Sequence, residues 1–119
     1  MLIVEASDIQ ERTKRFALEV IKLVTELPER SITGVLGKQL LRCSTSIGAN
    51  YRAACRARSK NEFYAKMCIV VEEADETCYW LELLKEAKLV QKDMSNIEDE
   101  ALQLLKIFSA TRKKAKPNK

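Results

Sequence analysis

Basic side chains without an acidic neighbour mark the stretch from Ser31 to Asn61, which holds six cations and no carboxylate. These cations are Lys38, Arg42, Arg52, Arg56, Arg58 and Lys60. Guanidinium and ammonium groups gathered in this way attract the phosphates of a nucleic-acid backbone. A second set lies in the basic tail 112–119 and comprises Arg112, Lys113, Lys114 and Lys116. Phosphate binding is therefore the first chemistry that the sequence suggests.

The following segment, 62–88, has the opposite charge, with seven acidic and three basic residues. Folding the chain back near residues 57–60 places Arg42 opposite Asp75 and Glu76, so we expect a structural ion pair there. Pairing of this kind accounts for part of the basic charge without any ligand. Arg52, Arg56 and Arg58, the cations nearest the turn, have only one carboxylate opposite them, that of Glu62. Their charge is therefore available to bind a partner.

Catalytic and metal-binding chemistry has little support in this sequence. Histidine is absent, which removes the commonest general base and most sets of zinc ligands. Cys43, Cys55, Cys68 and Cys78 lack the close pairing of zinc-binding cysteines, so we expect buried free thiols. The small residues at 44–46 have no His or Lys at the spacing of a triad, and we interpret them as sites of close helix approach. The sequence predicts a protein that is not an enzyme and has no cofactor and no metal.

Length and composition favour one helical domain. A chain of 119 residues with three glycines and two prolines is long enough to bury its own core. No apolar run reaches the length of about 18 residues that a membrane span requires, and the first residues lack the basic start of a secretory signal. We therefore expect a cytoplasmic protein without a membrane partner.

Apolar residues recur at alternating spacings of three and four along four segments, which is the pattern of amphipathic helices. Ser7, Ser59 and Ser95 each precede a Gln or Glu by three residues, as in a capping box. The predicted helices cover about 7–27, 33–57, 60–88 and 95–114. Short connections make neighbouring helices antiparallel. The predicted fold class is all-α, an antiparallel up-down-up-down four-helix bundle formed by a single domain over 1–119.

Two predicted helices carry residues that do not fit a plain apolar stripe. Asn50 falls on the stripe of the second helix, where a polar side chain fixes helix register and oligomeric state, with contact to a ligand as the alternative. The third helix carries Tyr79, Trp80 and Leu83 beside its stripe. Apolar residues around most of a helix indicate a contact with another chain, so we predict a homo-oligomer interface there. The alternative is that Trp80 covers the edge of a neighbouring helix.

Three segments together carry a resemblance to a known family: LRCSTSIGAN at 41–50, SKNEF at 59–63 and ADE at 74–76, followed by Leu81. They resemble the four-helix-bundle family encoded in 23S rRNA intervening sequences. The most specific parts are Ser46-Ile47-x-x-Asn50 and Ser59-x-x-Glu62-Phe63. The resemblance covers about half of the chain, in the second and third predicted helices.

The resemblance also implies an assembly and binding partners, which the residues alone do not. Family members look like homopentameric rings, and the family is similar to the accessory protein of diversity-generating retroelements, which binds nucleic acid and a reverse transcriptase. Asn50 and Glu76 match polar positions of the family on facing helices. Many members follow this Asn with Ile-Ala-Glu-Gly, whereas this chain has Tyr-Arg-Ala-Ala at 51–54. A role that depends on that Glu therefore does not carry over.

Two functions follow as hypotheses. The first is a non-catalytic oligomer, a pentamer by resemblance, that binds the backbone of RNA or DNA through its basic surface. That surface comprises Arg52, Arg56, Arg58, Lys60, Arg112, Lys113, Lys114 and Lys116. The second is a protein-interaction scaffold, for a partner such as a polymerase, without direct contact to nucleic acid.

Overall fold

The chain folds into four helices that lie side by side, and the computed structural model describes residues 6–118. These helices are α1 (Ala6–Thr25), α2 (Ser31–Cys55), α3 (Lys60–Glu86) and α4 (Ser95–Ala115), and no strand occurs among the described residues. Residues 1–5 of the predicted domain and Lys119 of the predicted tail lie outside the described part. The all-α class is confirmed, and each predicted helix lies within a few residues of its observed bounds.

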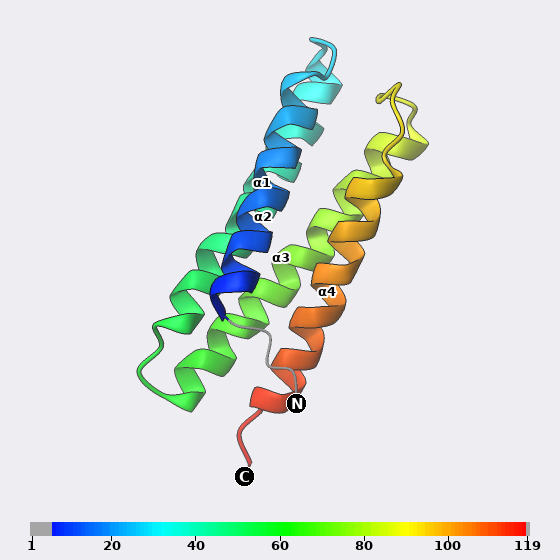
Figure 1. Cartoon of the computed structure of the whole chain (residues 1–119). Helices are drawn as coiled ribbons and strands as arrows, with labels where there is room; N and C mark the ends of the chain where they lie inside the picture. Colours follow the sequence, from blue (N-terminus) through cyan, green and yellow to red (C-terminus); the bar gives the residue numbers. More distant parts are fainter. Residues whose placement is uncertain (1–5, 119) are drawn as a thin grey trace.

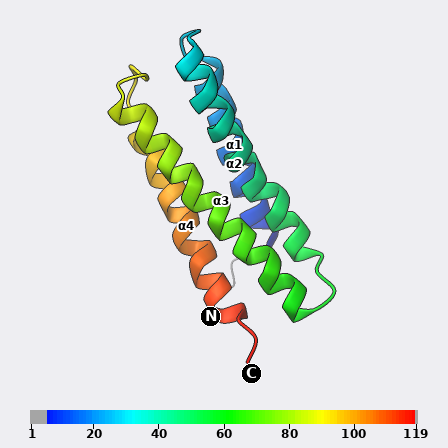
Figure 2. The same cartoon turned by 180° about the vertical axis from the view of Figure 1, so that it is seen from behind.

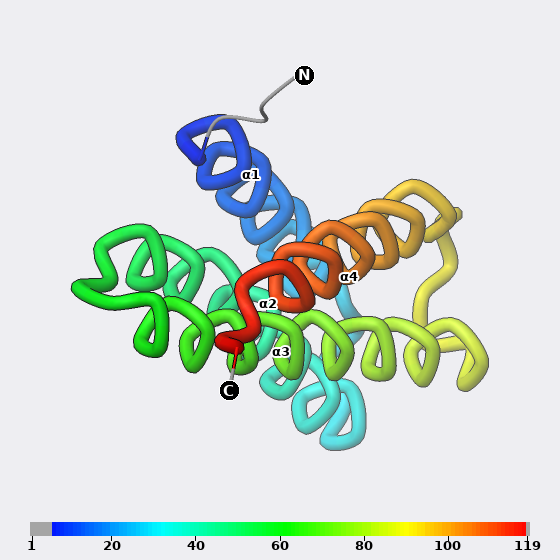
Figure 3. Tube along the Cα trace, turned by 90° about the horizontal axis from the view of Figure 1, so that it is seen from below, coloured from blue at the N-terminus to red at the C-terminus, as the bar shows by residue number. Residues whose placement is uncertain are grey.

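Successive helices run in opposite directions, as Figure 1 and the reverse view in Figure 2 show. The α1–α2 turn and the α3–α4 loop lie at one end of the bundle, while the α2–α3 turn and the end of α4 lie at the other. Each helix packs on the next in sequence, and α1 also contacts α4, which closes the four-helix arrangement. The view along the bundle in Figure 3 shows that the four helices cross rather than run parallel.

The core consists of the apolar stripes that the sequence predicts, with one correction in α2. Its largest fully buried side chains include Phe16 and Phe108. Asn50 is only half-buried, and its Nδ2 donates a hydrogen bond to the Ser46 carbonyl oxygen at 2.9 Å. Tyr51 takes the core position instead, with its ring centroid 5.2 Å from that of Phe108. The prediction of a polar Asn50 on the core stripe is therefore wrong.

Helix ends follow the predicted signals in part. Ser59 is the N-cap of α3, and its Oγ accepts a hydrogen bond from the Glu62 N–H at 3.0 Å. Ser7 and Ser95 instead lie inside the first turns of α1 and α4. Met94 is the N-cap of α4, and the carboxylate of the preceding Asp93 accepts hydrogen bonds from both the N–H and the hydroxyl of Ser95.

Two helices approach each other closely at a glycine. A Cβ atom built on Gly48 of α2 would lie 3.1 Å from the Thr13 Oγ1 of α1, so a larger residue would displace its neighbour. The small residues at 44–46 do not all face a neighbouring helix, because Ser44 is buried while Thr45 is exposed. Their contribution to close helix approach is therefore smaller than expected. Close approach of α1 and α2 therefore depends on Gly48 more than on the predicted run.

Candidate nucleic-acid interface

The two basic segments, more than 50 residues apart in the sequence, meet at one end of the bundle. Arg58 and Lys60 belong to the α2–α3 turn and the start of α3, while Lys114 and Lys116 belong to the end of α4 and the tail that follows it. All four line one groove of about 580 Å³ together with Phe63. Figure 1 shows the turn and the end of α4 at this same end. We call these four cations and Phe63 the basic groove.

The other four predicted cations lie near the basic groove, at the end of α2 and on the last turns of α4. Arg52 and Arg56 are exposed at the end of α2, and Lys113 is exposed on α4. Arg112 is half-buried, and its charge acts on the Tyr64 hydroxyl of α3. None of the eight predicted cations forms an ion pair with a carboxylate of residues 6–118. The structure thus brings the predicted set together and leaves its charge uncompensated by ion pairs within the described chain.

One carboxylate lies beside this surface. Glu62, in the first turn of α3, accepts a hydrogen bond on Oε2 from the backbone N–H of Arg58 at 3.3 Å. Its position near the N-terminus of α3 also suits the helix dipole. Glu62 therefore has a local structural role that does not occupy the side chain of any predicted cation.

Arg42, by contrast, is compensated by α3. Its guanidinium forms ion pairs with Glu73, at 3.3 Å, and with Glu76. Of the two predicted partners, Glu76 therefore pairs with Arg42, whereas Asp75 forms no ion pair with residues 6–118, and Glu73 is a partner that was not predicted. Arg42 is exposed, which places this pair at the surface of the bundle rather than inside it.

Glu76 serves two donors at once. Its Oε2 accepts the indole N–H of Trp80 at 2.9 Å as well as the guanidinium of Arg42. The hydrogen bond from Trp80, joined by the charge of Arg42, lowers the pKa of the Glu76 carboxyl below its ordinary value. Glu76 therefore links α2 to the aromatic side chain of α3.

The residues predicted to contact another subunit differ in exposure. Tyr79 is 53% exposed, whereas Trp80 and Leu83 are half-buried and pack against the core. The Tyr79 and Trp80 rings meet edge to face at 5.3 Å. Tyr79 also lines a shallow acidic surface on α3, which it shares with Glu72, Asp75, Glu76, Cys78 and Glu82.

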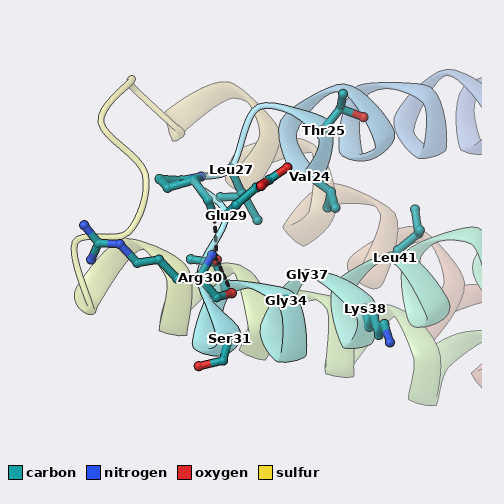
Figure 4. Close-up of a pocket in the computed structure, with 12 residues that line it drawn as sticks. Val24, Thr25, Leu27, Glu29, Arg30, Ser31, Gly34, Gly37, Lys38 and Leu41 are labelled. Atoms are coloured by element: carbon teal, nitrogen blue, oxygen red, sulfur yellow. Dashed lines mark hydrogen bonds between the residues drawn. The ribbon is translucent and has the colours of Figure 1, made fainter.

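A second groove, of about 630 Å³, lies between the end of α1 and the start of α2. Its lining includes Val24, Leu27 and Leu41, with Lys38 at one side, as Figure 4 shows. At its rim the Thr33 hydroxyl accepts a hydrogen bond from the Arg30 N–H at 3.1 Å, which holds the turn before α2. The lining is mainly apolar and gathers no group of cations comparable with the basic groove.

Sequence reasoning missed the contact that joins α1 to α4. Arg12 donates two hydrogen bonds of 2.7 Å to the carboxylate of Glu100 and a third, of 2.9 Å, to Gln103. The cation and the carboxylate are half-buried on two helices that are distant in the sequence. Only the pairing of distant helices brings them together, so no local spacing signals this contact.

The thiols differ from the prediction of buried cysteines. Cys43 is buried and accepts a hydrogen bond from the Thr77 hydroxyl at 3.1 Å, and burial raises the pKa of its thiol. Burial also raises the pKa of the half-buried Cys78 to about 11. Cys68 is half-buried as well, and Cys55 is exposed, so the prediction is right for Cys43 alone. Residues 6–118 contain no cluster of three His, Cys, Asp or Glu side chains placed to hold a metal ion.

Comparisons with known proteins place the chain in a family. Among residues 6–118 no helix is long and apolar enough to span a membrane. The chain is similar to a crystal structure of a protein of unknown function from the S23 ribosomal protein family of Bacteroides thetaiotaomicron, with 32% identity and a TM-score of 0.84. The alignment covers 92% of this chain and 99% of that one. A search of curated proteins finds no match. Residues 5–110 match the model of the 23S rRNA-intervening sequence protein family, and the chain therefore belongs to this family, as its sequence motifs indicate.

Proposed function

We propose that the protein is a non-catalytic homo-oligomer that binds the phosphate backbone of RNA or DNA through the basic end of the bundle. The observation that supports this proposal is the convergence of the α2–α3 turn with the end of α4. Their eight cations form no ion pair with a carboxylate of residues 6–118. Aromatic side chains are few at this end, so backbone contact is favoured over base-specific recognition.

Salt dependence tests the proposal. Phosphate contacts release condensed counterions, so log K should fall linearly with log salt, by about 0.9 per neutralised phosphate on duplex DNA. Replacing Arg52, Arg56 and Arg58 together by Gln should weaken binding to all sequences and make the slope shallower by about 1 per lost contact. Fluorescence anisotropy with labelled RNA and DNA measures both quantities.

The matched control removes the same charge at the other end of the bundle. Lys22 in the last turn of α1, Lys38 in the first half of α2 and Lys88 just after α3 are exposed and distant from the α2–α3 turn, so their joint replacement by Gln should change the slope less. Equal effects of the two triple variants would show that net charge, and not this surface, determines binding. Neither variant should change the oligomer mass.

The second candidate function is a protein-interaction scaffold. It is favoured by the acidic surface of α3, where the exposed Tyr79 lies among Glu72, Asp75 and Glu82. An exposed aromatic ring within a charged rim is typical of a protein-binding surface. If the wild-type protein shifts neither RNA nor DNA at about 50 mM salt, where phosphate contacts are strong, the scaffold hypothesis takes precedence.

A further inference from the structure

The basic groove has the size of a ligand site and not merely of a charged face. Its volume of about 580 Å³ lies within the range of pockets that hold small molecules. Its two walls come from separate elements, the α2–α3 turn with the start of α3 on one side and the end of α4 with its tail on the other. A ligand in the groove would therefore contact both basic segments at once.

The charge inside the groove exceeds what one internal phosphate of a strand requires. Arg58, Lys60, Lys114 and Lys116 line it, and no carboxylate does. An internal phosphodiester carries one negative charge, whereas a phosphomonoester carries about −1.5 to −2 at pH 7. The partial positive charge at the start of α3 is offset by Glu62 in the same turn, so the four side-chain cations carry the positive charge of the groove. Four cations around one small volume thus favour a phosphomonoester.

Phe63 supplies the apolar part of the lining. It is half-buried and packs against the core, so its ring is held by the bundle. Bases stack on aromatic rings without regard to sequence, at about 1–3 kcal/mol per base. A phosphate and an adjoining base together make a nucleotide with one free phosphate group.

We propose that the basic groove binds the phosphorylated end of a nucleic-acid strand, with the terminal phosphate among its four cations and the terminal base against Phe63. This inference rests on the proposed function and gives it a specific point of attachment. Arg52, Arg56, Arg112 and Lys113 lie outside the groove lining, where they contact the phosphates that follow. The strand end then fixes the register of backbone binding.

The test compares single strands of one sequence that differ only at their ends. Labelled 10-mers with a 5′-phosphate, a 3′-phosphate or hydroxyls alone are titrated with the full-length protein by fluorescence anisotropy. One phosphorylated strand should bind about tenfold more tightly than the hydroxyl strand, as expected for added charge-assisted hydrogen bonds. Lys60→Gln with Lys114→Gln should abolish this preference, and Phe63→Leu should reduce it.

The matched control is Arg52→Gln with Arg56→Gln, which removes the same charge outside the groove lining. It should weaken all strands alike and leave the tenfold ratio intact, while circular dichroism checks that every variant is folded. Equal, salt-dependent binding of all three strands would overturn the end-binding site and leave the proposed function standing. Absence of binding to every strand would overturn both. If AMP displaces the phosphorylated strand with the same affinity as the strand itself, the groove binds free nucleotides and the strand-end assignment is wrong.

Discussion

A single carboxylate, that of Glu76, accepts hydrogen bonds from a cation of α2 and an indole of α3. Each contact alone is worth little, because exposed ion pairs contribute about 0–1 kcal/mol. Their common partner makes them interdependent, since loss of the carboxylate leaves the Trp80 N–H without its acceptor and leaves Glu73 as the remaining ion-pair partner of Arg42. The contribution of Glu76 to stability should therefore be measured by changing the charge of its carboxylate.

Acid should reveal the role of Glu76. Its pKa is lowered in the folded state, so its contribution to stability is present above the ordinary glutamate pKa of about 4.3 and is lost as the pH falls through the folded value. Glu76→Gln should remove this part of the acid dependence. A series of urea unfolding curves from about pH 7 downward, across the ordinary glutamate pKa of about 4.3, measures the change.

The control for this prediction is Glu72→Gln on the same helix. Glu72 is exposed and forms no ion pair with residues 6–118, so its replacement should leave the acid dependence closer to that of the wild type. A double-mutant cycle of Glu76→Gln with Arg42→Ala separates the ion pair from the Trp80 hydrogen bond. Identical acid dependence in Glu72→Gln and Glu76→Gln would contradict the assignment.

At the scale of helices, the spacing of apolar residues predicted most of the core. It failed in α2, where the buried face moves by one position near Asn50. A seven-residue repeat places Asn50 after Cys43, but an ideal helix drifts by about 20° per heptad. The shift brings Tyr51 onto the buried face, four residues after Ile47, where it meets Phe108. Spacing alone could not decide between neighbouring positions, because the ring of Phe108 belongs to a different helix.

Helix starts were predicted where a single local pattern was present, as at Ser59. At Ser95 the pattern predicted a serine cap, but Asp93, two residues earlier, accepts both polar hydrogens of that serine. A charged acceptor near a helix N-terminus also interacts with the helix dipole, which explains why it prevails. Local competition of this kind cannot be resolved from residue types and spacing.

The end of α3 offers a stabilising substitution. Lys88 has φ of 58°, and the Leu89 N–H reaches the Leu84 carbonyl oxygen at 3.1 Å, as in a Schellman motif. Glycine adopts this left-handed conformation without the strain that a Cβ atom causes. Lys88→Gly should raise the free energy of unfolding by up to about 1 kcal/mol, measured by urea denaturation. Lys88→Ala keeps the Cβ atom, so it should not raise the free energy of unfolding. An increase equal to that of Lys88→Gly would refute the explanation.

For the whole molecule, the up-down-up-down order determines which basic segments meet. The sequence predicted both segments and the antiparallel topology, which together place the α2–α3 turn and the end of α4 at one end. It did not predict the basic groove, because the shape depends on how the chain leaves α4. Lys116 has an extended ψ of 122°, which the following Pro117 favours, but this local preference does not tell which helix the tail lies against.

For the whole molecule we predict assembly into a homo-oligomer. In the proposed oligomer the α3 aromatics meet another subunit, so Trp80→Ala should weaken assembly more than Phe16→Ala. Phe16 is almost completely buried, and its truncation should chiefly cost about 3–5 kcal/mol of folding stability. Size exclusion with light scattering should report several times the chain mass of 13.6 kDa for the wild type. A monomer at micromolar concentration would contradict the interface.

The sparse contact between α1 and α4 has a consequence for the motions of the bundle. α1 shares fewer contacts with the other helices than α2 or α3 does, and Arg12 with Glu100 supplies much of the polar contact across this side. Proteins open in cooperative units, beginning with those that have the fewest contacts. We therefore expect detachment of α1 to be the first sub-global opening, with its amide hydrogens exchanging with solvent before those of α3 in a hydrogen-exchange measurement. The site vacated by α1 has the shape of that same helix, so at high concentration the α1 of a second copy can fill it, and two chains become linked by exchanged helices.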